Sequence, residues 1–103
     1  MVVLRFLPVA VLLASVQAVA YDGLEADFAT CTQSNDSGAV VSACTRLIDN
    51  AAVENSVTGM FYGLRAANNT DAAQNCADAK KSLALAEDAT IKSLSQQLID
   101  QNC

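Results

Sequence analysis

Residues 39–49 read Ala-Val-Val-Ser-Ala-Cys-Thr-Arg-Leu-Ile-Asp, and this stretch decides the fold. Its apolar side chains recur every three or four residues, which places them on one face of an α-helix. The polar side chains at positions 42, 46 and 49 fall on the opposite face. Because one apolar position is a cysteine, we expect this helix to be joined covalently to another segment. The apolar positions are Val40, Ala43, Cys44, Leu47 and Ile48.

The first 20 residues have the three-part layout of a secretory signal peptide. A short head carries one positive charge at Arg5, and a nearly unbroken apolar run follows up to position 16. Small residues then fit a cut after Ala20, and a cut after Ala18 stays open. The run is about half as long as the ~20 apolar residues of a membrane-spanning helix. We therefore expect cleavage and export to the periplasm or the cell exterior, with no stable membrane insertion afterwards.

The predicted mature protein is one small acidic domain, residues 21–103. Its formal charge is −6, because the whole chain carries −5 and Arg5 leaves with the leader. An apolar core of this size supplies only about 3–5 kcal/mol, so covalent cross-links are expected. An even number of cysteines in an oxidising compartment predicts two disulfides. The cysteines are Cys31, Cys44, Cys76 and Cys103.

Helical periodicity recurs along the whole mature chain, and no segment has the alternation of a strand. The expected helices are 23–32, 39–49, 56–68 and 71–86, and a last helix that begins at Glu87-Asp88. The sequence therefore predicts an all-α fold of about five short helices, arranged in disulfide-stapled helical hairpins. The positions expected to face the core outside 39–49 are Leu24, Phe28, Cys31, Val57, Met60, Phe61, Leu64, Ala72, Cys76, Ala79, Leu83, Ala86, Ile91, Leu94 and Leu98.

Two glycines in the segment 56–68 predict close helix packing. Gly59 and Gly63 are four residues apart and so share one helix face. Each costs about 1 kcal/mol in a helix interior. We expect the backbone of a neighbouring helix to approach this face closely.

The cysteine spacing favours one disulfide pairing. Cys31 and Cys44 are 13 residues apart, which is about 20 Å along a continuous helix. The Cα atoms of a disulfide lie within about 7 Å, and the turn-forming cluster at 34–38 supplies the reversal that this requires. A turn near Glu87-Asp88 joins Cys76 to Cys103 in the same way. Four cysteines allow three pairings, so the other two stay open.

The first part of this pattern resembles the degenerate tetratricopeptide-like (TPR or Sel1-like) repeat units of small exported bacterial proteins. In those units a cysteine precedes a helix that carries the pair Cys-Thr, as Cys31 precedes Cys44-Thr45 here. The separation of Cys44 and Cys76 is 32 residues, near the 34-residue period of that repeat.

The next stretch extends the resemblance. Residues 59–71 read Gly-Met-Phe-Tyr-Gly-Leu-Arg-Ala-Ala-Asn-Asn-Thr-Asp and look like the first helix and turn of a following unit. Tyr62-Gly63 would be its close-packing pair, and residues 71–85 would be its second helix. The resemblance covers residues 30–86 and implies TPR-like packing of the helices.

The composition excludes several chemistries. The chain has no histidine and no CxxC spacing, which removes Ser-His and Cys-His nucleophilic pairs and the usual zinc ligand sets. Glu87 and Asp88 are adjacent carboxylates, but neighbours on a helix point about 100° apart and do not share a pocket. We therefore expect no enzyme activity, no metal and no cofactor. The acidic balance argues against nucleic-acid binding.

The largest apolar and aromatic cluster of the mature chain is Met60-Phe61-Tyr62. Met60 and Phe61 fit a helix core stripe, which is the plainer interpretation. The functional alternative is a partner-binding face formed by Met60, Tyr62 and Arg65, because Tyr and Arg are enriched at binding hot spots. Asn35 and Asn68 begin glycosylation sequons, which matter only in a eukaryotic secretory pathway.

These observations predict a small exported helical protein that acts by binding an unknown protein partner. Two alternatives remain open at this point. One is a secreted carrier that holds a small apolar ligand between its helices. The other is an antagonist or immunity protein that blocks an enzyme or a toxin, with binding that salt weakens. The sequence does not fix the oligomeric state.

Overall fold

The computed structural model describes residues 21–103, and the predicted signal peptide and its cleavage site lie outside the described residues. Five α-helices make up this part of the chain, and it contains no strand. The prediction of an all-α fold is confirmed. The helices are α2 (Leu24–Gln33), α3 (Ser37–Asn50), α4 (Asn55–Asn68), α5 (Ala72–Leu85) and α6 (Ala89–Asn102).

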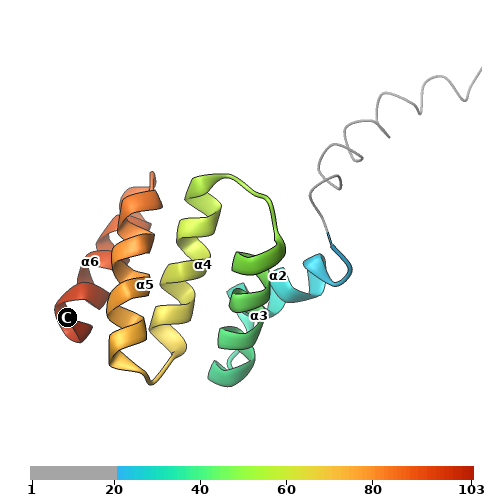
Figure 1. The fold of residues 1–103 in the computed structure, drawn as a ribbon, viewed down its shortest axis with the longest axis horizontal. Helices are drawn as coiled ribbons and strands as arrows, with labels where there is room; N and C mark the ends of the chain where they lie inside the picture. Colours follow the sequence, from blue (N-terminus) through green and yellow to red (C-terminus); the bar gives the residue numbers. More distant parts are fainter. Residues whose placement is uncertain (1–20) are drawn as a thin grey trace, which may run out of the picture.

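Aspartate caps set the start of three helices. The side chains of Asp36, Asp71 and Asp88 accept hydrogen bonds from backbone N–H groups in the first turns of α3, α5 and α6. Each such cap contributes about 1 kcal/mol. Short turns separate these helices, so consecutive helices double back and lie side by side (Figure 1).

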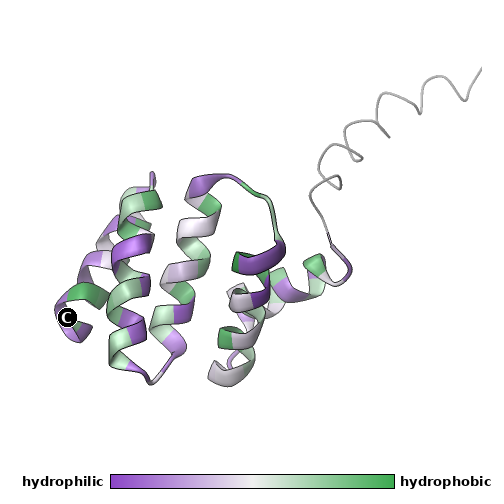
Figure 2. Ribbon diagram, in the orientation of Figure 1, coloured by the Kyte–Doolittle hydropathy of each residue, from purple (hydrophilic) through white to green (hydrophobic). Residues whose placement is uncertain are grey.

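Helix α4 is shared by two halves of the molecule. It packs against α2 and α3 on one side and against α5 and α6 on the other (Figure 1). We call residues 21–54 the N-terminal half and residues 69–103 the C-terminal half. Apolar and polar residues are interspersed along every helix (Figure 2), as expected of helices that bury one face.

The two faces of α4 carry side chains of different size. Phe61 is buried and belongs to the core of the N-terminal half. Ala66 is buried on the opposite side, with Ala79 and Leu98 of the C-terminal half. The fully buried residues of the N-terminal core are Cys31, Val40, Ala43, Cys44, Leu47 and Phe61.

The predicted close approach at the two glycines is confirmed. A Cβ atom on Gly59 would lie 3.0 Å from Leu85 Cβ and 3.2 Å from the carbonyl oxygen of Ser82. A Cβ atom on Gly63 would lie 2.9 Å from Ser82 Oγ. The Ser82 hydroxyl donates to the Gly59 carbonyl at 2.7 Å, so α4 and α5 meet through small residues and a hydrogen bond.

The stripe predicted for α5 is partly wrong. Ala79 and Ala86 are buried as expected, but Ala72 is exposed. The other buried positions of α5 are polar: Asn75, Asp78 and Ser82. Asp78 and Ser82 have hydrogen-bond partners on neighbouring helices. The amide nitrogen of Asn75 donates to the Asn69 carbonyl, while its buried Oδ1 has no partner in the described part of the chain. A pattern of apolar residues does not detect such buried polar positions.

Both predicted disulfides are present. Cys31–Cys44 has a Cα–Cα distance of 5.0 Å, and Cys76–Cys103 has one of 5.1 Å. The first bridge is buried in the N-terminal core, whereas Cys103 is exposed. Such bridges are typical of an oxidising compartment. Within residues 21–103, no helix combines the length and apolar character that a bilayer crossing requires.

Candidate functional site

An apolar groove of about 270 Å³ lies between α2 and α4. Residues of α2, of the loop before α4 and of the first two turns of α4 form it. Of the side chains that line the groove, one is charged, Glu25 of α2. The lining residues are Leu24, Glu25, Phe28, Val53, Val57 and Phe61.

Phe28 is the unusual side chain of this groove. It is 42 % exposed, and it is the one large hydrophobic residue of the described part that is exposed. Its ring meets the ring of buried Phe61 edge to face, with centroids 6.0 Å apart. We predicted that Phe28 would face the core, and this is wrong for about half of its surface. The ring contacts the core with one edge and borders the groove with the rest.

A buried carboxylate fixes α2 on α3 and so holds one wall of the groove. Asp27 is 8 % exposed. It accepts hydrogen bonds from Arg46 of α3 at 2.8–3.1 Å and from the Tyr21 hydroxyl at 2.7 Å. Hydrogen bonding from Arg46 lowers the pKa of Asp27. Gly23, with φ of +89°, lets the chain turn so that Tyr21 reaches Asp27.

Tyr21 is held in its neutral form at this place. Burial, followed by the hydrogen bond to Asp27, raises the pKa of Tyr21 to about 12. The Asp27–Arg46 pair and the disulfide Cys31–Cys44 join α2 to α3 at two points, and Tyr21 supports the first of them. The groove therefore has a rigid wall, which limits the entropy lost when a partner binds.

The residues predicted to bind a partner lie elsewhere on α4. Met60 is partly buried and packs against the N-terminal core. Tyr62 is partly buried, and its ring centroid lies 5.5 Å from Arg65 Cζ. The structure thus brings Tyr62 and Arg65 together, while Met60 packs with the core. The role of these residues in partner binding stays a prediction.

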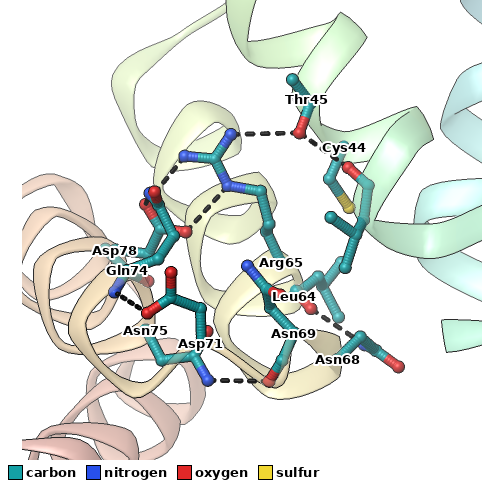
Figure 3. A network of polar contacts seen from close by, with 12 residues as sticks. Cys44, Thr45, Leu64, Arg65, Asn68, Asn69, Asp71, Gln74, Asn75 and Asp78 are labelled. Carbon is teal, nitrogen blue, oxygen red and sulfur yellow. Dashed lines mark hydrogen bonds and ion pairs between the residues drawn. The ribbon is translucent and has the colours of Figure 1, made fainter. Parts of the chain in front are cut away.

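Arg65 is engaged inside the molecule (Figure 3). Its Nε and Nη2 atoms donate to the two carboxylate oxygens of Asp78 at 2.7 and 2.8 Å. Its Nη1 donates to Thr45 Oγ1 at 3.1 Å. Its side chain is 13 % exposed and that of Asp78 is 3 % exposed. The hydrogen bond to Asp78 raises the pKa of Arg65. Through Asp78 and Thr45, the Arg65 side chain connects α4 to both α5 and α3.

Two serines of the C-terminal half form a buried pair. Ser95 Oγ lies 2.8 Å from Ser82 Oγ, and both serines are fully buried. A hydroxyl nucleophile needs an adjacent base, and the contacts of these serines are to a second hydroxyl and to backbone carbonyls. In the described part of the chain, no three potential metal ligands come together.

A second depression, of about 420 Å³, lies on α6. One helix face forms it, and no aromatic side chain lines it: the lining residues are Ala89, Thr90, Ser93, Leu94 and Gln97. The α2/α4 groove is the better candidate site because two helices build it and aromatic rings line it. The exposed fraction of Phe28 could not be deduced from sequence, since its spacing from Leu24 and Cys31 is that of an ordinary core stripe.

Comparison of the chain with protein-family models, with curated proteins and with solved structures finds no match. The resemblance to tetratricopeptide-like repeats therefore stays a prediction.

Proposed function

We propose that this is an exported, non-catalytic protein that binds a partner protein through the α2/α4 groove. The observation that carries the proposal is Phe28, a large aromatic side chain left 42 % exposed beside an apolar groove. Aromatic residues on a rigid support are the usual anchors of protein interfaces.

The open form of the groove favours a protein over a small ligand. Pockets that hold a small molecule have volumes of about 300–1,000 Å³ and bury most of its surface. The α2/α4 groove, at about 270 Å³, is at the lower limit of that range, and Phe28 on its border is 42 % exposed. Side chains of a partner protein suit such an open site better than an enclosed ligand does.

Export is supported by the two disulfides and by the signal-like composition of residues 1–20. The helix spacing supports a repeat-like packing. Helices α4, α5 and α6 begin at residues 55, 72 and 89, one every 17 residues. Two such helices span the period of the tetratricopeptide repeat, about 34 residues, and proteins built from that repeat act as binding scaffolds.

The test is capture of a partner by the oxidised protein from the exported fraction of its host, with identification by mass spectrometry. A Phe28→Asp variant places a charge in the groove. The matched control is Ala29→Asp, which adds the same charge at the next, exposed position of α2. A third variant, Tyr62→Ala, probes the face predicted from sequence.

A stoichiometric partner that is lost with Phe28→Asp and kept with Ala29→Asp would support the proposal. A partner that is lost only with Tyr62→Ala would place the binding site on the face of α4 that carries Tyr62, and not at the groove. Absence of any partner, together with lipid that copurifies with the wild-type protein, would favour the carrier function instead.

A further inference from the structure

We infer that the segment received by the α2/α4 groove is a cationic amphipathic helix of the partner. Its apolar side chains would fill the groove, and its Lys and Arg side chains would lie over the acidic groups at the edge. This inference rests on the proposed function, since it names the chemistry of the partner at the same site.

The charge around the groove supports it. Glu25 lines the groove, and Glu54 directly follows the lining residue Val53. Asp22 lies two residues before the lining residue Leu24. All three acidic side chains are on exposed residues. One acidic residue therefore lines the apolar groove, and two more lie within two residues of its lining along the chain. Their negative charge is complementary to that of a cationic partner.

No nearby base cancels these carboxylates. The N-terminal half contains six acidic residues and one basic residue, a net charge of −5. The basic residue is Arg46, whose guanidinium is paired with Asp27. The C-terminal half, with five acidic and three basic residues, carries only −2. Opposite potentials of this kind steer a charged partner to the matching surface.

Two helix N-termini lie at the groove, since α2 begins at Leu24 and α4 begins at Asn55. The N-terminus of a helix carries a partial positive charge, which opposes the charge of the carboxylates. Each is equivalent to about +0.5 elementary charge. Together they offset about one of the three carboxylates, so the edge stays negative. The side chain of Glu54 makes no hydrogen bond to the first turn of α4, which leaves its carboxylate available to a partner.

The same charges argue against other occupants. A symmetric dimer through this face would bring two acidic edges together, because a twofold interface pairs the same surface of both copies. An anionic lipid surface would be repelled for the same reason. Helical partners commonly place side chains at positions i and i+4 into an apolar groove, and the inferred partner segment takes this form.

The test uses two synthetic helical peptides with the same Leu and Phe face. One carries Lys on its polar face and the other carries Glu. Binding of each labelled peptide to the oxidised protein is measured by fluorescence polarisation at ionic strengths of about 0.01 and 0.15 M, between which the Debye length falls from about 30 to 8 Å. We expect binding of the Lys peptide alone, weaker at the higher ionic strength.

Two double variants locate the effect. Glu25→Gln with Glu54→Gln removes two charges at the groove and is expected to weaken the Lys peptide about tenfold, or about 1.4 kcal/mol. Glu87→Gln with Asp100→Asn removes two exposed charges from the C-terminal half. This variant is expected to change the affinity by less than about twofold at 0.15 M, because salt screens charges that lie farther from the peptide than the Debye length.

Equal binding of both peptides, or an equal loss in both double variants, would overturn the inference. Self-association that Phe28→Asp abolishes would overturn it too and assign the groove to a second copy. If neither peptide binds but a captured partner depends on Phe28, the inference fails and the proposed function stands. If the captured partner is also independent of Phe28, both fail.

Discussion

The two halves that share α4 are stabilised by different kinds of contact. The N-terminal half buries large apolar side chains, among them Val40, Leu47 and Phe61. The C-terminal half buries small or polar ones, among them Ala79, Ser82 and Ser95. Small residues let helices approach closely, whereas large ones hold them apart and can leave unfilled space between them. The apolar groove accordingly lies where α4 meets the half with large side chains.

The same contrast appears in the surface charge. The N-terminal half has a net charge of −5 and the C-terminal half has −2. The disulfides differ as well, since Cys31–Cys44 is buried while Cys103 is exposed. The half with the groove is thus the half with the more negative net charge and the buried bridge. We interpret it as the binding half and the other as its support.

The largest expected effect comes from removing the ring that anchors the N-terminal core. Phe61→Ala deletes a side chain that is 1 % exposed and is expected to cost about 4 kcal/mol. Phe28→Ala, at 42 % exposed, is the control and is expected to cost about 1 kcal/mol. Urea unfolding of the oxidised proteins measures both. Equal losses would show that Phe28 is part of the core and not a binding side chain.

The next effect tests the connection between the halves. Asp78→Ala leaves the guanidinium of Arg65 without its main partner in a site where the Arg65 side chain is 13 % exposed. Loss of one partner from such a pair is expected to cost about 3 kcal/mol. Asp100→Ala removes an exposed carboxylate and is expected to change stability by less than about 0.5 kcal/mol. A similar, small loss in both variants would contradict a structural role for the pair.

Two glycine-to-alanine changes test the close packing of α4 on α5, and we expect smaller changes in stability of opposite sign at the two positions. Gly59→Ala would place its Cβ 3.0 Å from Leu85 Cβ. The cost of overpacking, about 2 kcal/mol, exceeds the gain in helix propensity of about 1 kcal/mol, so we expect a net loss. Gly38→Ala meets only ordinary contact, at 3.5 Å from Asp36 Oδ1, and is expected to gain about 0.5 kcal/mol. Stabilisation by both changes, measured as Tm, would contradict close packing.

The sequence predicted what depends on local pattern. The five helices and the close approach at Gly59 and Gly63 follow from periodicity and from the conformational cost of glycine. The favoured disulfide pairing followed from the reach of a disulfide across a turn, and it is the one observed.

The sequence could not predict what depends on a partner from another helix. The burial of Asp78 requires Arg65, which is 13 residues away along the chain, and nothing in the local pattern joins the two. Phe28 has the spacing of a core residue, yet α4 covers only one side of its ring. The groove therefore results from how α2, α4 and the loop before α4 meet, which the pattern of a single helix does not contain.

The last effect depends on pH and concerns the clamp that holds α2 on α3 in the N-terminal half. The pKa of Tyr21 is raised from its ordinary value of 10.0 to about 12, so the folded state favours the neutral phenol. The stabilisation is complete below pH 10 and is lost as the pH rises towards 12. Over this range the stability of the wild-type protein is expected to fall towards that of Tyr21→Phe, which lacks the hydroxyl bonded to Asp27.

Two measurements check this expectation. Urea unfolding of the wild-type and Tyr21→Phe proteins at successive pH values gives the difference in stability. Absorbance of the phenolate during alkaline titration gives a late step near pH 12, which Tyr21→Phe should lack and the control Tyr62→Phe should keep. A late step that survives in Tyr21→Phe would show that the clamp does not hold the phenol. The wall of the groove would then rest on the disulfide Cys31–Cys44 and the Asp27–Arg46 pair alone.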